Sequence, residues 1–308
     1  DVFVPDALLT GVFTDERDRL VALAYRMTGS WADAEDVVQE TWVRWSSVDR
    51  RDIRSPVAWL TTVTTRLAID RRRSIDRRRE QYVGPWLPEP ASTTPGPEDD
   101  LEMSESLTLG FLVLLDRLSP TERAVFLLAE VFGEPYSTIA DAVGKTPAAC
   151  RQIASRARQK IRGARDLEGA GITPSKDRPD VGDVEPADHE LIKKLLVALS
   201  LGDAQRVAEL LDPSVTLVTD GGPSRHAARR PVVGPYRVTR LLLNLSKRLT
   251  DRTAHFSDVN GSLGLVFCMP DGSVDWVASC DQVDGRIAHI WVMGNPDKLA
   301  RVRSPLTQ

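Results

Sequence analysis

The chain has 308 residues, of which 42% are hydrophobic and 27% are charged, and its formal net charge is −4. This length supports two or three domains with separate cores. No apolar run approaches the roughly 18 residues of a membrane helix. The first residues carry no basic leader or apolar core, so we expect no secretory signal.

The cysteine pattern bears on the cellular compartment. The three cysteines, Cys150, Cys268 and Cys280, form no Cys-x-x-Cys pair. Buried thiols in a reducing cytoplasm are the favoured interpretation, with Cys268 and Cys280 on neighbouring strands as the alternative. We therefore expect a cytoplasmic protein with no metal site and no cofactor.

Residues 7–80 have a helical pattern throughout. Ser30 is a predicted N-cap with Asp33 three residues later. In the helix that follows, Asp33, Asp36 and Glu40 form an acidic stripe beside an apolar face. By itself, such a stripe is most often a solvated helix surface.

A second helix in this region is strongly basic. Ser55 and Pro56 predict its start, and seven arginines but only two acids lie between Arg66 and Arg79. Arginine contacts phosphates and base edges, and tryptophan and threonine, such as Trp59 and Thr62 on the same face, contact unpaired bases. A solvated helix end stabilised by the helix dipole is an equal alternative on these residues alone.

Residues 82–105 contain five prolines, six acids and no base, which predicts a linker. Helical patterning returns at residues 106–166. Ser119 and Pro120 open one helix there, and the pattern Tyr136–Val143, Gly144–Thr146, Pro147 has the spacing of a helix-turn-helix.

The last helix of this pattern has the character of a recognition helix. Between Lys145 and Arg165 there are seven bases and no acid. A recognition helix places its N-terminal residues at base edges and its later bases on phosphates. The expected base-edge residues are Ala148, Arg151, Gln152 and Ser155, the expected phosphate contacts are Arg156, Arg158, Lys160 and Arg162, and Cys150, Ala154, Ala157 and Ile161 form the apolar stripe.

After a second linker at residues 167–186, residues 187–308 predict an α+β domain. Two helices, at about 188–200 and 203–211, precede a strand at Val215–Val218 and a helix at about 234–249. Four strands follow, separated by the hairpin dipeptides Asn-Gly, Asp-Gly and Asp-Gly. Within this domain, helices thus come first and an antiparallel meander follows, which is the order typical of the α+β class.

The helical regions resemble an extracytoplasmic-function sigma factor. Residues 20–80 resemble its second region through Ala24–Ser30, Asp33–Trp42 and Trp59–Arg73, and residues 113–164 resemble its fourth region through Leu118–Arg123 and Ser155–Arg158. The resemblance implies binding to core RNA polymerase and to promoter DNA, as duplex and as the melted minus-ten strand. The first domain would then read the minus-ten element and the second the minus-thirty-five element.

The same resemblance assigns roles to particular residues. It implies that the polymerase is bound by Asp33, Asp36, Gln39, Glu40 and Trp42. It implies that the minus-ten element is read by Trp59, Thr62, Thr65, Arg66, Asp70 and Arg73. Arg66 stands where many members have asparagine, so the minus-ten preference of other members does not transfer. The loop at residues 49–54 matches the segment that captures a flipped base.

The remaining residues resemble a subgroup that carries a fused SnoaL-like domain of the nuclear-transport-factor fold. The matching segments are Tyr82–Pro90, Asp220–Pro223 and Asn295–Leu299. In this subgroup the fused domain modulates activity in cis. The implied regulatory or interdomain residues are Trp86, Leu87, Pro88, Asp220, Gly221, Gly222, Asn295, Pro296, Asp297 and Lys298.

Trp86 and Leu87, between prolines, are costly to leave in water, so we expect the linker to dock on the C-terminal domain. That domain should be a cone, with Phe267, Trp276, Trp291 and Met293 filling its interior or lining a pocket. Asp281 with His289, or Asp275 with Trp276, would be the catalytic candidates if the domain were an enzyme. We favour no catalysis and leave any ligand of the cone unidentified. The alternatives are a ligand-responsive helix-turn-helix repressor and a SnoaL-type enzyme fused to a DNA-binding module.

Overall fold

The computed structural model describes residues 6–48, 53–91, 108–168, 186–260, 262–302 and 304, without the side chains of residues 6–10, 163–168 and 186–188. The chain divides into two compact units. The helical unit comprises residues 1–81 and 114–162, and the C-terminal unit comprises residues 82–113 and 163–308. The described part of the predicted linker, residues 82–91, is thus grouped with the C-terminal domain. Most of the loop expected to capture a flipped base lies outside the described residues.

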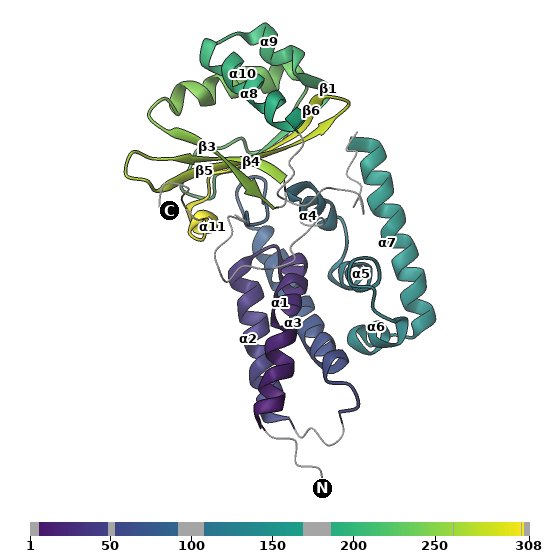
Figure 1. The fold of residues 1–308 in the computed structure, drawn as a ribbon. Coiled ribbons are helices and arrows are strands. Elements are labelled where there is room, and N and C mark those ends of the chain that lie inside the picture. Colours follow the sequence, from purple (N-terminus) through teal and green to yellow (C-terminus); the bar gives the residue numbers. More distant parts are fainter. Residues whose placement is uncertain are drawn as a thin grey trace. The chain divides into compact units, whose positions relative to one another are not determined.

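Three helices open the helical unit: α1 (Asp6–Thr28), α2 (Trp31–Ser47) and α3 (Pro56–Arg79) (Figure 1). Both predicted N-caps form, because the Ser30 hydroxyl accepts from the Asp33 amide at 3.2 Å and the Ser55 hydroxyl from the Ala58 amide at 3.3 Å. The core contains apolar side chains from all three helices, including the fully buried Leu20, Leu23, Met27, Ala34, Leu60 and Ala68.

The rest of the helical unit contains the predicted helix-turn-helix. After α4 (Leu109–Leu115), which crosses the boundary between the units, come α5 (Pro120–Phe126), a π-helical turn η2 (Leu127–Val131), α6 (Tyr136–Val143) and α7 (Pro147–Glu168). Gly144 ends α6 in the left-handed conformation, at φ 65°. The Thr146 hydroxyl caps α7 by accepting from the Ala149 amide at 3.2 Å. The predicted apolar stripe of α7 is confirmed, since all four of its residues are buried.

The C-terminal unit combines helices with a six-stranded sheet. Its elements are α8 (Pro186–Leu201), α9 (Ala204–Glu209), β1 (Leu211–Asp220), β2 (Val232–Val233), α10 (Pro235–Arg248), β3 (Thr253–Val259), β4 (Ser262–Cys268), β5 (Val274–Val283), β6 (Arg286–Met293) and α11 (Pro296–Leu299). The strand order is β2-β1-β6-β5-β4-β3. The predicted meander of β3 to β6 is confirmed, and the predicted fold class holds for both units.

Two features of the sheet differ from the sequence expectation. β1 runs on to Asp220, past the predicted end at Val218, and pairs in parallel with β6. The two-residue β2 on its other side was not predicted. The parallel pairing joins residues 73 positions apart in the sequence, such as Thr216 and His289, and no local pattern encodes it.

The two faces of the sheet have different coverings (Figure 1). On the inner face, α8, α9 and α10 pack over a core that includes Leu242, Ile290 and Val292. On the outer face, Leu87 and Leu299 pack against Val266, Val277, Trp291 and Met293. Trp291 and Met293, expected inside the cone, therefore lie on its outer side, whereas Phe267 and Trp276 lie on the inner side. The alternation of a strand explains this division.

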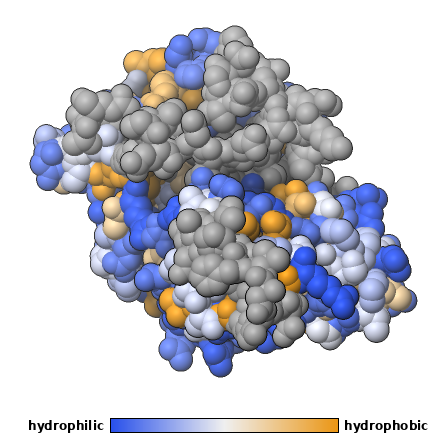
Figure 2. Space-filling model, turned by 60° about the horizontal axis from the view of Figure 1, so that its bottom comes forward, coloured by the Kyte–Doolittle hydropathy of each residue, from blue (hydrophilic) through white to orange (hydrophobic). Residues whose placement is uncertain are grey.

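Among the described helices, none combines the length and the apolar character that crossing a membrane requires. Hydrophilic residues cover most of the described surface on the face shown in Figure 2, with smaller apolar patches between them.

Candidate nucleic-acid interface and linker-docking site

The acidic stripe of α2 is divided between two environments. Asp36, Gln39 and Glu40 are exposed, and the side chain of Asp36 is 59% accessible. The side chain of Asp33 is only 14% accessible and lies 3.1 Å from Arg71 and 3.4 Å from Arg78 on α3. Asp33 therefore joins two helices, while Asp36, Gln39 and Glu40 are exposed although Asp36 also lies 3.2 Å from Arg71.

Trp42 and Trp59 are packed side chains of the helical unit. The Trp42 ring lies 4.9 Å from the ring of Phe13, and the Trp59 ring lies 5.4 Å from that of Trp45, both in tilted geometry. Both residues are half-buried. Each thus keeps an accessible edge but contributes to the stability of the bundle.

The expected minus-ten face of α3 is only partly exposed. Arg66, Asp70 and Arg73 are exposed and Thr62 is half-buried. Thr65, in contrast, is fully buried, and its hydroxyl donates to the Thr61 carbonyl at 2.7 Å. This burial corrects the expected surface by removing Thr65, because a side chain facing the bundle core does not reach DNA.

Arg66 also has partners within the helical unit. Its Nε donates to the Ala142 carbonyl at 3.2 Å, and its Nη2 donates to the Asp141 carbonyl at 2.6 Å. Both carbonyls lie in the last turn of α6, where helical carbonyls lack intrahelical partners and the helix dipole is negative. The guanidinium of Arg66 thus caps the first helix of the helix-turn-helix.

The outer face of α7 is open at its N-terminal end. Ala148, Arg151, Gln152, Ser155 and Arg156 are all exposed. Of the expected phosphate contacts, Arg158 is half-buried with its Nε 3.6 Å from Glu130, and Lys160 is 2.7 Å from Glu122. Arg162 is exposed. The base-edge residues are therefore more available than two of the residues expected on phosphates.

A buried ionic group, which we call the Asp116 cluster, joins the two parts of the helical unit. Asp116 pairs with Arg72 at 3.0 Å, Arg79 at 2.7 Å and Arg123 at 2.8 Å. Arg123 is fully buried and also donates to the Arg26 carbonyl at 2.7 Å. The cluster thus connects α5 to α1 and α3.

The charges of this cluster shift the pKa values of its members. Burial alone would raise the pKa of Asp116, but the three guanidiniums outweigh burial and hold it at about 2. Burial lowers the pKa of Arg123 to about 9. In the sequence, Arg123 is distinguished only as the end of the Leu118–Arg123 segment. Its partners lie far away in the sequence, and no local signal indicates them.

A second buried group, which we call the Asp220 node, holds the linker on the C-terminal unit. One carboxylate oxygen of Asp220 accepts from the Leu87 amide at 2.9 Å and from Lys298 at 2.7 Å. The other oxygen accepts from the Tyr82 hydroxyl and from the Gly222 amide. Asp220 and Leu87 are each only 1% accessible. The expected docking of the linker on the C-terminal domain is therefore observed.

Lys298 completes the Asp220 node from α11. Its Nζ donates to the Leu87 carbonyl at 2.6 Å and lies 3.6 Å from the centre of the Trp86 ring. Asn295 caps α11 through the Asp297 amide and donates to the Tyr82 hydroxyl at 3.0 Å. Burial and the hydrogen bond to Asp220 raise the pKa of Tyr82. Pro296 takes the first position of α11.

The glycines beside Asp220 are required by close packing. Gly222 has φ +67°, and a Cβ there would lie 2.7 Å from the Asn295 side chain. A Cβ on Gly221 would lie 2.8 Å from that of Ala227. A further anchor lies at the end of the linker motif, where Ala91 and Asn260 exchange hydrogen bonds of 2.9 and 2.8 Å. Pro88 is buried between these two anchors.

The catalytic candidates of the C-terminal domain lie side by side but outside its interior. Asp281 and His289 are register partners on β5 and β6. His289 is 7% accessible, and its ring lies 5.6 Å from that of Trp291, on the outer face of the sheet. Asp275 is paired with Arg225 and Arg252. Asp281 and His289 thus do not face the space between helices and sheet.

Comparison with known proteins supports the assignment of both helical parts. Residues 12–78 match Sigma-70 region 2, and residues 109–161 match Sigma-70, region 4. The chain is 37% identical over 304 residues to the ECF RNA polymerase sigma factor SigJ of Mycobacterium tuberculosis, covering 95% of this chain and 93% of the relative. It is 39% identical over 203 residues to a probable ECF sigma factor, SigI, of the same organism, covering 65% of each chain.

The structural comparison agrees with these matches. The crystal structure of M. tuberculosis SigJ superimposes with a TM-score of 0.74 and 33% identity, covering 97% of this chain and all of that one. The expected resemblance to an extracytoplasmic-function sigma factor with a fused C-terminal domain is thereby confirmed. Both matches extend over the helical regions and the C-terminal domain. The chain belongs to the extracytoplasmic-function RNA polymerase sigma factors.

Proposed function

We propose that this sigma factor contacts core RNA polymerase through the exposed side of α2. The exposed Asp36, Gln39 and Glu40 would supply the polar contacts there, with Trp42 at their border. Asp33 would act indirectly, by holding α2 against the arginines of α3. A partner surface with basic residues suits this acidic stripe.

Promoter DNA would be read by α3 and α7. On α3 the accessible residues are Thr62, Arg66, Asp70 and Arg73, together with the exposed edge of Trp59. On α7 they are Ala148, Arg151, Gln152, Ser155 and Arg156. For Arg66 to reach DNA, its guanidinium must leave the α6 carbonyls. Minus-ten recognition would therefore be coupled to separation of α3 from α6.

The C-terminal domain would modulate this activity in cis. The observation that carries this proposal is the burial of a linker backbone segment in the Asp220 node, where both the amide and the carbonyl of Leu87 are bound. The linker connects the two regions that read DNA. A domain that holds or releases it changes the length of chain available between them.

We infer that the C-terminal domain performs this role without catalysis. Asp281 and His289 are on the outer face of the sheet, and Asp275 is neutralised by two arginines. A sigma factor of this kind acts in the cytoplasm, where RNA polymerase is found.

In vitro transcription with core polymerase and a genomic fragment library tests these roles in the full-length chain. Asp36→Ala should reduce transcript yield at limiting sigma concentration, and excess protein should restore it. Arg151→Ala should change the choice among promoters at constant polymerase binding. Lys193→Met, at an exposed position, is the control.

The same assay tests cis modulation through Lys298→Met. We expect its transcript yield to differ from that of the wild type, while binding to core polymerase stays the same. Equal yields would refute the regulatory role of the Asp220 node. If the chain gave no specific transcripts with core polymerase but bound duplex DNA tightly by itself, a repressor role would replace these proposals.

A further inference from the structure

The C-terminal unit contains an apolar cavity between its helices and the inner face of its sheet. The cavity volume is about 580 Å³, within the range of about 300–1,000 Å³ that is typical of small-molecule sites. Protein interiors contain few voids larger than a water molecule. The cavity reaches the surface, since Leu201 at its rim is 74% exposed, so a small molecule can enter it from solvent.

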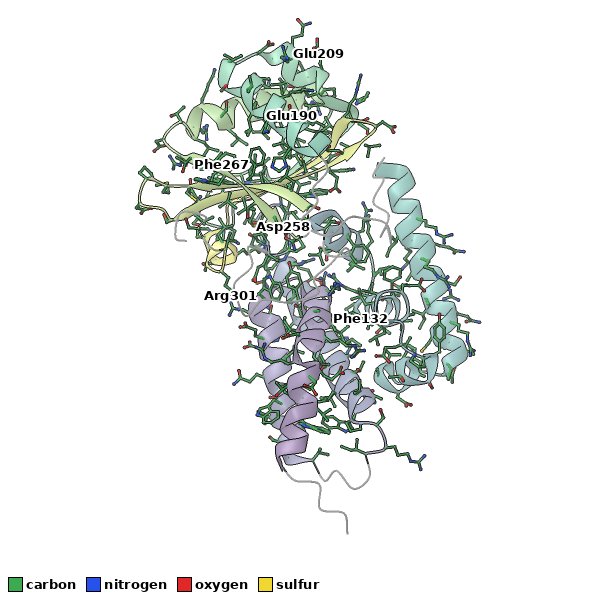
Figure 3. All side chains as sticks on the ribbon, viewed as in Figure 1. Phe132, Glu190, Glu209, Asp258, Phe267 and Arg301 are labelled. Atoms are coloured by element: carbon green, nitrogen blue, oxygen red, sulfur yellow. The ribbon has the colours of Figure 1, made fainter. Side chains whose placement is uncertain are left out.

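The cavity wall is made of side chains that a ligand would bury further. Leu199 of α8 and Leu243 of α10 line one side, and Phe267 of β4 (labelled in Figure 3) and Trp276 of β5 line the other. All four are only half-buried, although they belong to the interior of a domain. An apolar occupant would remove this surface from water, which is the main source of affinity for such sites.

The charged groups at the cavity have one sign. Among the described residues that line it, Lys247 and Arg252 are charged and none is acidic. Arg252 donates to Asp275 at 2.9 Å and also pairs with Asp251. Lys247 is exposed at the end of α10, with no ion-pair partner among the described residues. An anionic group on the ligand would therefore find a basic partner at Lys247.

The wall carries no acid–base pair for a reaction. Asp281 and His289 do not line the cavity, and the described lining residues with titratable side chains are Lys247, Arg252 and Cys280. An apolar space with cations and no carboxylate suits binding of an amphiphilic acid without turnover.

We propose that this cavity binds an apolar carboxylic acid of the fatty-acid type. Its hydrocarbon part lies among the leucines of α8 and α10, against Phe267 and Trp276. Its carboxylate lies at Lys247. The chemistry of the wall thus selects both parts of the ligand: an apolar body for affinity and one negative charge for orientation.

Calorimetry with dodecanoate and with its methyl ester tests the two parts of this proposal on the full-length chain. We expect one dodecanoate to bind per chain, and Lys247→Met to weaken it by about tenfold, the effect of one charge-assisted hydrogen bond. The methyl ester should bind wild type and Lys247→Met equally. If the ester bound wild type as tightly as the acid, the carboxylate specificity would be refuted.

A cavity-filling variant locates the ligand. Ala278 of β5 lines the cavity, so Ala278→Trp should abolish dodecanoate binding. Val233→Trp adds the same ring at a position that is 53% exposed and should leave binding unchanged. Unaltered binding in Ala278→Trp would overturn the site.

Alkylation of the unmodified protein gives a test that does not depend on any variant folding. Cys280 lines the cavity and is half-buried, whereas Cys150 and Cys268 are fully buried. Dodecanoate should slow the reaction of Cys280 with iodoacetamide, measured by mass spectrometry, with the two buried thiols as internal references. No protection of Cys280 at saturating dodecanoate would refute the proposed site.

A ligand in the cavity would also be placed to influence the proposed cis modulation. On β6, Ile290 and Val292 face the helices, while Trp291 and Met293 pack on the side of the linker. A ligand on one face thus contacts strands that carry the docked linker on the other. This link rests on the proposed function, whereas the binding and alkylation experiments do not. Binding without any effect of dodecanoate on transcription would refute the link and leave the site intact.

Discussion

The Asp116 cluster and the Asp220 node are both built on a buried carboxylate, but the groups that bind the carboxylate differ. Each binds a segment that is remote in the sequence to the body of its unit through a buried carboxylate. In the cluster three guanidiniums converge on Asp116, and a backbone carbonyl accepts from Arg123. In the node one ammonium meets Asp220, and most of the remaining partners are backbone groups and a phenol.

The difference indicates what each site holds. The cluster joins side chains of α3 and α5 with one another, so its stability depends on charges carried by both segments. The node binds the Leu87 amide and carbonyl, so it recognises the path of the linker backbone more than the charge of its side chains. Release of the linker would leave Asp220 and Lys298 paired with one another, which lowers the cost of undocking.

The largest expected effect is the loss of Arg123. Arg123→Met leaves Asp116 with two partners and the Arg26 carbonyl without its donor. Breaking such a buried ionic contact costs about 3–5 kcal/mol, measurable in urea unfolding followed by helical circular dichroism. Arg73→Met removes an exposed pair with Asp70 and should cost at most about 1 kcal/mol. Equal effects of the two changes would contradict the assigned role of the cluster.

The loss of Lys298 should cause the second-largest destabilisation, and the effect should be confined to the docked linker. Lys298→Met leaves the Asp220 carboxylate buried without a counter-charge, at a cost of about 3 kcal/mol. Hydrogen exchange of the Leu87 amide should accelerate, because its acceptor becomes unstable in the docked position. Lys193→Met is the control, and unchanged protection of Leu87 in Lys298→Met would show that the linker docks without the ion pair.

A smaller effect is expected at Gly222, where two costs add. Gly222→Ala places a Cβ against Asn295 and forces a positive φ, for a total of about 1–3 kcal/mol. Gly272 also has a positive φ but has no atom within 4 Å of an added Cβ. Gly272→Ala should therefore cost only the backbone strain, of about 1–2 kcal/mol. Thermal unfolding of both variants separates the two contributions, and a larger loss at Gly272 would disprove the close packing.

The smallest effects concern the dependence of stability on pH. One titrating residue in each unit is responsible, and the causes of the two pKa shifts differ. Burial lowers the pKa of His289, although Asp212 opposes this. The neutral ring is favoured in the fold, so its contribution to stability is complete above the unfolded pKa of about 6.5 and falls as pH decreases below that value. His289→Gln should flatten this decline, measured in urea unfolding of the C-terminal unit from about pH 8 to about pH 5.

The Asp116 cluster should persist to more acidic conditions. The pKa of Asp116 is held at about 2, against an unfolded value of about 3.9. Its stabilising contribution is therefore complete above the unfolded value and is lost as pH falls towards 2. The protection factors of the α5 amides, which correct for the pH dependence of intrinsic exchange, should stay constant between about pH 6 and about pH 5, where those of the sheet already decrease. A parallel decline of both units would contradict the comparison.

Local signals in the sequence predicted most of the elements. Ser30, Ser55 and Ser119 marked helix starts, and the Asn-Gly and Asp-Gly dipeptides marked the hairpins between β3 and β6. These features depend on residues close together in the chain, such as a side-chain oxygen and an amide three residues later. The basic helices, the linker motif and the family resemblance were likewise readable from the sequence.

The tertiary structure alone decided which of these residues face solvent and which face one another. Thr65 points into the bundle, Arg66 caps α6, and Trp291 lies outside the cone where Trp276 lies inside. The parallel pairing of β1 with β6 and the gathering of Tyr82, Asp220 and Lys298 join positions separated by up to 216 residues in the 308-residue chain. Such contacts depend on how whole elements pack, because burial and ion pairing are properties of the assembled core and not of any local segment.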